Sequence, residues 1–200
     1  MNNRLYILPF LAVLQFLSAC SSKIVSNNYY NLNQDELLRI EEKYKRLNNQ
    51  KPFTLSFTDK DFNIVSLEMI TDTLTYIYEF NTRETNLADT LTKYGYATSG
   101  ILDIMRRMQQ IKCTWITSFD YYVNDRERNL VFISIKPRVI RQLFSPPKYL
   151  ILAYFDQPQV FDNQGRLLDG RRTKRLRKLK GQVFTRITDR ICYTVAEKYR

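Results

Sequence analysis

Cys20 is the residue whose type and position most clearly predict chemistry in this chain. It follows the small residues Ser18 and Ala19, which come after a short apolar run, Leu5 to Leu17, with Arg4 in front of it. A cysteine thiolate attacks an alkyl donor readily, so a thioether is the modification that this position favours. A basic start, an apolar stretch too short for a comfortable membrane span and small residues at its exit are typical of a secretory signal.

The segment Leu17-Ser18-Ala19-Cys20 resembles the lipobox of bacterial lipoprotein precursors, of a Bacteroidota-like type. The resemblance implies that the chain is cut before Cys20, which leaves residues 1–19 as a lipoprotein signal peptide. It also implies that Cys20 carries a diacylglyceryl thioether and that its new amine receives a fatty acid such as palmitate. The alternative interpretation is an uncleaved N-terminal anchor, or an apolar strand of a soluble fold.

The residues after Cys20 bear on the location of the domain. They are Ser21, Ser22 and Lys23, without the acidic run that marks export to the cell surface in Bacteroidota lipoproteins. By that resemblance we expect a lipid anchor in the outer membrane and a domain facing the periplasm. Residues 20–33 are rich in Ser and Asn. They are predicted to form a flexible tether, about 40 Å long if extended at about 3.3 Å per residue.

A basic run towards the C-terminal end is the strongest predicted surface feature. Seven of the ten residues from Arg171 to Lys180 are Lys or Arg, and none is acidic. Cations this dense repel one another unless a counter-charge is near, and anionic lipid headgroups supply about 1 kcal/mol per cation. The alternative is a solvated surface kept basic for solubility. The cations are Arg171, Arg172, Lys174, Arg175, Arg177, Lys178 and Lys180.

The charge balance narrows the class of partner. Removal of residues 1–19 takes away one cation, so the formal net charge falls from +11 to +10 in a mature chain of 181 residues. A basic exported domain attracts acidic surfaces. We therefore expect the membrane, other envelope proteins, and anionic lipid or glycan as partners. We do not expect nucleic acid, because export separates the domain from it.

The chain contains no histidine, which removes the commonest general base and the commonest metal ligand. It also lacks a Gly-rich phosphate loop and a Gly-x-Ser-x-Gly elbow. We expect no catalytic residue, no metal and no cofactor besides the covalent lipid, and therefore no enzymatic activity. A hydrolase that uses carboxylates is a third alternative, with Asp120 and Asp156 as its candidates because they lie beside aromatic strand residues.

Cys113 and Cys192 are the cysteines that remain once Cys20 carries lipid. An even pair in an oxidising compartment is a candidate disulfide, and a disulfide requires Cα atoms within about 7 Å. The alternative is that each is a separate small apolar core residue. The sequence leaves both interpretations open.

The apolar patterns predict a single α+β domain over residues 34–200, with an antiparallel sheet of about five or six strands covered by helices. Helical spacing marks residues 33–47, 86–94 and 99–111. The same spacing predicts a C-terminal amphipathic helix through Val183, Phe184, Ile187, Ile191 and Val195. Strands are predicted at 53–57, 62–70, 74–80, 113–123, 130–135 and 149–155.

The leading functional hypothesis is a lipid-anchored, non-enzymatic envelope protein that docks or assembles other proteins. A small lipoprotein with a β-rich domain is similar in architecture to lipoprotein subunits of envelope-spanning secretion machines. The alternative is a ligand-binding module for glycan or lipid, which the 14 tyrosines beside basic charge favour. A deep Tyr-lined pocket would favour ligand binding, and a flat exposed patch would favour assembly.

Overall fold

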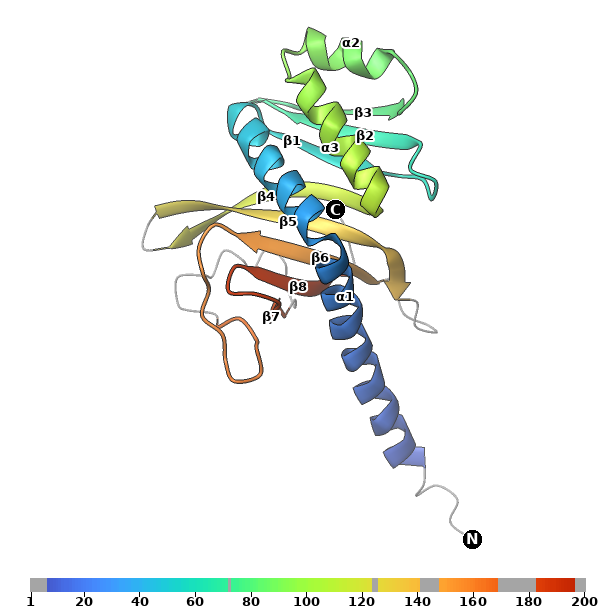
Figure 1. Ribbon diagram of the computed structural model, residues 1–200, viewed down its shortest axis with the longest axis vertical. Coiled ribbons are helices and arrows are strands. Elements are labelled where there is room, and N and C mark those ends of the chain that lie inside the picture. The colour runs from blue at the N-terminus through green and yellow to red at the C-terminus, as the bar shows by residue number, and fades with distance from the viewer. Residues whose placement is uncertain (1–6, 72, 124–125, 141–147, 169–182, 197–200) are drawn as a thin grey trace.

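The computed structural model describes residues 7–71, 73–123, 126–140, 148–168 and 183–196. Within these ranges the chain forms one antiparallel sheet of eight strands with three helices, which confirms the predicted α+β class. The strand order is β3-β2-β1-β4-β5-β6-β8-β7, so strands near in sequence are mostly near in space (Figure 1). The sheet is larger than the five or six strands predicted.

The helices are α1 (Ile7–Gln50), α2 (Asn86–Lys93) and α3 (Thr98–Ile111). The strands are β1 (Phe53–Phe57), β2 (Ile64–Ile70), β3 (Thr75–Asn81), β4 (Cys113–Val123), β5 (Arg126–Ile140), β6 (Lys148–Phe155), β7 (Thr185–Arg186) and β8 (Ile191–Ala196).

The centre of the sheet is buried on both sides, which explains the nearly continuous apolar sequence of β6. Leu150, Leu152 and Tyr154 point into the core beneath the helices. Ile151 and Phe155 point into a second core on the opposite face. A strand turns successive side chains to opposite faces, so a strand with two apolar surroundings shows no alternation of apolar and polar residues.

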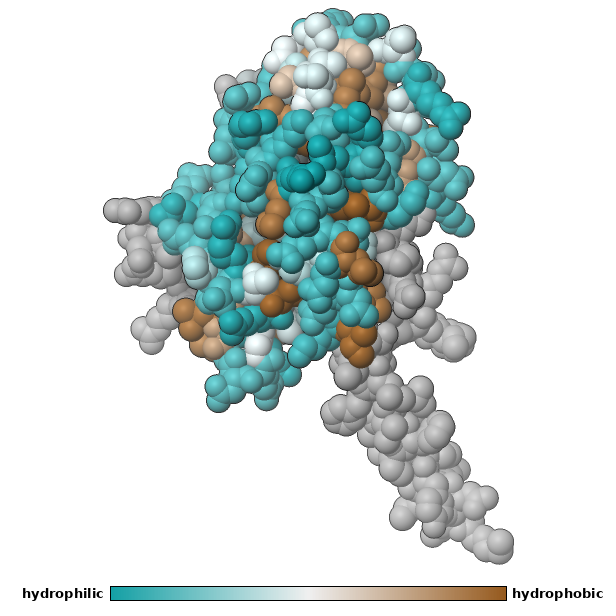
Figure 2. Space-filling view, in the orientation of Figure 1, coloured by the Kyte–Doolittle hydropathy of each residue, from teal (hydrophilic) through white to brown (hydrophobic). Residues whose placement is uncertain are grey.

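Helices α1 and α3 pack together over one face of the sheet (Figure 1). Their contact is close: a Cβ built on Gly100 of α3 would lie 2.7 Å from Cδ1 of Leu47 in α1. Apolar side chains of both helices enter the core, including Ile40 and Ile104. Hydrophilic side chains cover most of the described surface on this side, as the amphipathic pattern requires (Figure 2).

The predicted C-terminal helix is wrong. Ile191 to Ala196 form strand β8, which pairs with β6, and Thr185–Arg186 form the short edge strand β7. Ile191 and Tyr193 face the helix-side core, while Cys192 and Ala196 face the second core. Apolar residues at spacings of three and four fit such a doubly buried strand as well as a helix, and a short run does not distinguish the two.

The predicted flexible tether is helical in the structure. Helix α1 runs through residues 20–33, and its backbone leaves helical geometry at Asn33 (φ −124°, ψ 16°). The helix start predicted at Asn33 is therefore a kink inside a longer helix. The Ser and Asn composition predicted a loop, but Tyr29 and Tyr30 pack on the core, and such packing outweighs weak helix propensity.

Candidate functional site

Cys20 lies within α1, two residues before Ser22. Ser22 is buried, and Ser26, one helical turn further, is fully buried at 0% exposure. The lipid attachment point predicted from the sequence thus lies next to packed structure, and no loose spacer separates it from the domain. Residues 20–33 of α1 are called the anchor segment below.

Two tyrosines fasten the anchor segment to the sheet. The Tyr29 hydroxyl donates to the backbone oxygen of Ile111 at 2.6 Å and lies 3.4 Å from the sulfur of Cys113. Burial raises the pKa of Tyr29 well above its ordinary value. The neighbouring Tyr30 is 4% exposed and belongs to the main core. At the kink, the Asn33 side-chain amide donates to the Tyr29 backbone oxygen at 2.9 Å.

Cys113 and Cys192 are free and buried, so the disulfide that the sequence allowed is not formed. Cys113 begins β4 and faces the helix-side core, whereas Cys192 lies on β8 and faces the second core. Strands β5 and β6 separate them, so they lie at least about 14 Å apart at about 4.8 Å per strand. Burial raises the pKa of each thiol to about 12, so neither is an activated nucleophile.

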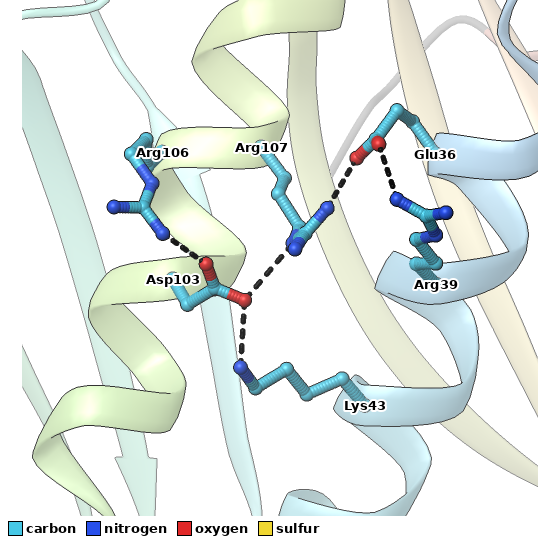
Figure 3. Close-up of polar contacts among 6 residues, drawn as sticks. All are labelled: Glu36, Arg39, Lys43, Asp103, Arg106 and Arg107. Carbon is cyan, nitrogen blue, oxygen red and sulfur yellow. Dashed lines mark hydrogen bonds and ion pairs between the residues drawn. The ribbon is translucent and has the colours of Figure 1, made fainter.

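An ion-pair cluster joins α1 to α3 (Figure 3). The Asp103 carboxylate accepts from Lys43 at 2.6 Å, from Nε of Arg107 at 2.9 Å and from Arg106. The hydrogen bonds from Lys43 and Arg107 hold the pKa of Asp103 well below its usual range. Three cations on one carboxylate predict a structural fastening between the helices rather than a proton-transfer group.

Glu36 extends this cluster along α1 (Figure 3). It lies 2.6 Å from Arg107 and 3.2 Å from Arg39, so Arg107 bridges acids on both helices. The hydrogen bonds to Asp103 and Glu36 raise the pKa of Arg107. The α1–α3 ion cluster consists of Glu36, Arg39, Lys43, Asp103, Arg106 and Arg107.

A second polar contact joins α1 to the sheet at the candidate carboxylates. Lys45 forms ion pairs with Glu41, at 2.6 Å, and with Asp156. The other carboxylate oxygen of Asp156 accepts a hydrogen bond from the backbone N–H of Asn129 at 2.9 Å. Asp120 is exposed and lies opposite Asn129 in the β4–β5 ladder. Strand β5 therefore separates the two predicted acids, and Asp156 is occupied in fastening α1.

Tyrosines gather where α2 meets β3. The ring centroids of Tyr76 and Tyr78 lie 5.8 Å and 5.9 Å from that of Tyr94, and the hydroxyls of Tyr78 and Tyr94 are 2.7 Å apart. The hydrogen bond to Tyr94 and burial raise the pKa of Tyr78. The Lys93 ammonium lies 5.7 Å from the Tyr94 ring centroid. These half-buried rings pack against one another and hold the inner face of β3.

The outer side of β3 is an edge of the sheet. Two hydrogen bonds fix the pattern at the ends of the β2–β3 pair: Thr71 N–H donates to Leu74 O, and Thr82 N–H donates to Asn63 O. Counting every second residue from these ends, the residues of β3 that form hydrogen bonds with β2 are Tyr76, Tyr78 and Phe80. Hydrogen bonding alternates along an antiparallel strand. The N–H and C=O groups of Thr75, Ile77 and Glu79 therefore point outwards, and no hydrogen bond to them is found within the described residues. These three residues form the free β3 edge.

Apolar side chains surround this edge on the sheet face away from the helices. Ile77 is 58% exposed. Ile70 and Ile64 on the neighbouring strand β2 are also exposed. Glu79 is the one acid on β3, and Glu68 lies beside Ile77 on the same face. The edge is thus apolar with local negative charge.

The basic run from Arg171 to Lys180 lies outside the described residues. Among the described residues, no group of three or more His, Cys, Asp or Glu side chains is placed to hold a metal ion. In the same part of the chain, no helix has the length and apolarity needed to cross a membrane.

Comparisons of the chain with protein-family models, with curated proteins and with solved structures find no match.

Neither the α1–α3 ion cluster nor the free β3 edge was predicted from the sequence. The pairs within α3 were detectable, because Asp103 precedes Arg106 and Arg107 by three and four residues. The pairing of Glu36 with Arg107 depends on how two helices far apart in sequence pack. No local pattern marks β3 as an edge, because edge position follows from the order of all strands.

Proposed function

We propose that this chain is a lipid-anchored, non-enzymatic protein of the cell envelope that acts as a docking or assembly component. Its anchor is a lipid on Cys20 in the outer membrane, and its domain faces the periplasm. The observation that carries the proposal is the course of α1 from Cys20 into the core. A domain joined to its lipid through packed helix keeps a defined orientation at the membrane, which suits a component that positions other proteins.

The lipid is tested by replacing its attachment residue. Cys20→Ser removes the thiol that forms the thioether, so we expect no radiolabelled fatty acid in the protein and an uncleaved precursor. Cys113→Ser is the control, because its thiol is buried, and it is expected to retain the label. Label that still enters the Cys20→Ser protein would refute the anchor.

The docking role is tested by changing only the stiffness of the connection. Seven residues inserted between Ser21 and Ser22 leave the lipid site and the packed part of α1 intact. A helical Ala/Glu/Lys insert makes about two turns, so it keeps the direction of the domain and raises it by about 10 Å. A Gly/Ser insert of equal length leaves the domain loosely tethered.

We expect the native membrane complex containing this protein to survive the helical insert and to be weakened at least tenfold by the flexible one. Native gel electrophoresis of membranes, with detection of the lipoprotein, measures this. Equal complex formation by both inserted proteins would show that a fixed orientation is not used. A wild-type protein that migrates alone would argue against an assembly role.

A ligand-binding module for glycan or lipid is the second candidate, favoured by Tyr76, Tyr78 and Tyr94 beside Lys93. Rings next to a cation suit sugars and headgroups. Titration of the protein with glycan fragments and with anionic vesicles tests it, and Tyr94→Ala is expected to reduce any binding. A complex that needs the fixed orientation, without ligand binding, favours assembly.

A further inference from the structure

We propose that the free β3 edge binds an extended segment of another envelope protein, which adds a ninth strand to the sheet. The segment carries an apolar or β-branched residue beside Ile77 and, two residues away, a Lys or Arg beside Glu79. This inference rests on the proposed docking function and names the surface and the chemistry of the partner.

The first support is the set of unused backbone groups. Thr75, Ile77 and Glu79 direct their N–H and C=O groups away from β2, and their side chains are exposed. A row of unpaired groups on a sheet edge is a template for another strand. β3 has no proline and no bulge in its pairing with β2, which are common means of protecting an edge.

The second support is the surface next to the edge. Ile77 is more than half exposed, and Ile70 on the neighbouring strand β2 adds to the same apolar area. An added strand would cover Ile77 and remove apolar surface from water. On this face Glu79 lies beside the position of a cation on the incoming strand, and Glu68 on β2 adds negative charge one strand further in.

The third support is the rigidity of the inner side of β3. Tyr76 and Tyr78 are held by Tyr94 from α2, and Phe80 is buried. A strand that is already straight and fixed pays little conformational entropy when a partner binds. The helix-side packing thus prepares the edge without blocking its outward groups.

The position of β3 argues for a different protein rather than a second copy of this chain. β3 lies at the end of the sheet far from the N-terminal part of α1 (Figure 1). Antiparallel pairing of two β3 strands would relate the copies by a two-fold axis across the sheet. Their anchor segments would then point in opposite directions, which two lipids in one membrane do not permit.

Site-specific photo-crosslinking in cells producing the full-length lipoprotein tests the proposal. A benzoylphenylalanine probe replaces Ile77, Glu79 or, as a control, the exposed Val160. We expect the probes at 77 and 79 to join one partner protein at positions two residues apart, and the probe at 160 not to do so. Crosslinks to a second copy of this chain, crosslinks without the two-residue spacing, or no crosslink at 77 and 79 would each overturn the inference.

Charge reversal supplies a matched second measurement. Glu79→Lys is expected to lower the crosslink yield from position 77 at least fivefold, because it repels the partner's cation. Glu42→Lys makes the same charge change at an exposed site on α1 and is expected to leave the yield unchanged. An equal yield from both variants would refute the cation beside Glu79. A native complex that persists while the edge probes capture nothing would refute this inference alone and leave the docking function standing.

Discussion

Asp103 illustrates how single residues set the stability of this fold. Its side chain is only 14% exposed and meets three cations, two from its own helix and one from α1. Hydrogen bonds from Lys43 and Arg107 keep its pKa below the ordinary range. The folded protein therefore binds a proton at Asp103 more weakly than the unfolded chain does, and this difference links stability to pH.

We predict that Asp103→Asn lowers the unfolding free energy by about 1–2 kcal/mol at pH 7. The depressed pKa means that the contribution of the carboxylate is fully present above the unfolded pKa of about 3.9. It is lost as the pH falls through the lower folded pKa. Urea unfolding of both proteins is expected to show a constant difference down to about pH 5 and a shrinking one below it. A difference that widens in acid would contradict this.

The buried thiols give a second prediction at the residue scale. With pKa values of about 12, Cys113 and Cys192 are ionised in roughly one molecule in ten thousand at pH 8. We expect iodoacetamide to modify neither in the folded protein and both in the denatured, unreduced protein, as counted by mass spectrometry. Two protected cysteines after denaturation would mean that they are joined by a disulfide.

At the scale of elements, apolar patterns in the sequence predicted several central strands well. Residues 53–57, 113–123 and 149–155 are strands close to their predicted bounds. Residues 86–94 and 99–111 are helical as expected. These segments succeed because each has one consistent period or clear end signals. Strand β8 was predicted wrongly because both of its faces are buried, so its sequence shows no alternation of apolar and polar residues. Helix α1 extends beyond its predicted start because the packing of Tyr29 and Tyr30 orders a polar segment.

The contact between α1 and α3 carries a prediction of its own. Gly100→Ala places a methyl group 2.7 Å from Cδ1 of Leu47, so the helices must separate or Leu47 must leave its position. We predict a loss of about 1–3 kcal/mol in unfolding free energy. Ser99→Ala, at the neighbouring exposed position, is the control and is expected to change it by less than about 0.5 kcal/mol. Equal unfolding free energies for the two variants, measured by thermal or urea unfolding, would contradict the close approach of α1 and α3 at Gly100.

At the scale of the whole molecule, the candidate surfaces depend on topology. Glu79 and Ile77 are recognisable in sequence as strand residues, but their place on an outer edge depends on where β4 inserts beside β1. The position of Cys20 was predictable from four adjacent residues, whereas its closeness to the core was not, because Ser22 and Ser26 carry no apolar signal. A local motif is therefore enough to predict the modification of Cys20, whereas a binding surface for a partner can be recognised only once the order of the strands in the sheet is known.

The basic run from Arg171 to Lys180 gives a prediction about how the whole protein contacts acidic surfaces. Reversal of Arg172, Arg175 and Lys178 to Glu is expected to spare the melting temperature, because the sequence predicts a surface run and surface charges contribute about 0–1 kcal/mol each. It is expected to weaken contact with an acidic surface as raised salt does. A protein target is revealed by loss of the native complex. A lipid target is revealed by loss of binding to anionic vesicles when residues 21–200 are produced without the signal peptide and lipid.

The matched control for this charge reversal changes the same number of cations elsewhere. Arg46, Arg83 and Arg166 are exposed and lie on separate elements. Their reversal is expected to leave both the complex and vesicle binding nearly intact. If neither triple variant loses either contact, the basic run serves only as solvated surface.

The packing of α1 also determines when the protein can finish folding. The first helix of the chain rests on β6 and on β8, so Tyr30 shares its core with Tyr193. A ribosome delivers the helix first and strand β8 last, about 160 residues later. Until that strand arrives, the apolar side of α1 lacks part of its docking surface, and closing so long a loop is slow. We therefore expect this core to stay incomplete, and the apolar side of α1 to remain open to chaperones, until β8 has been synthesised.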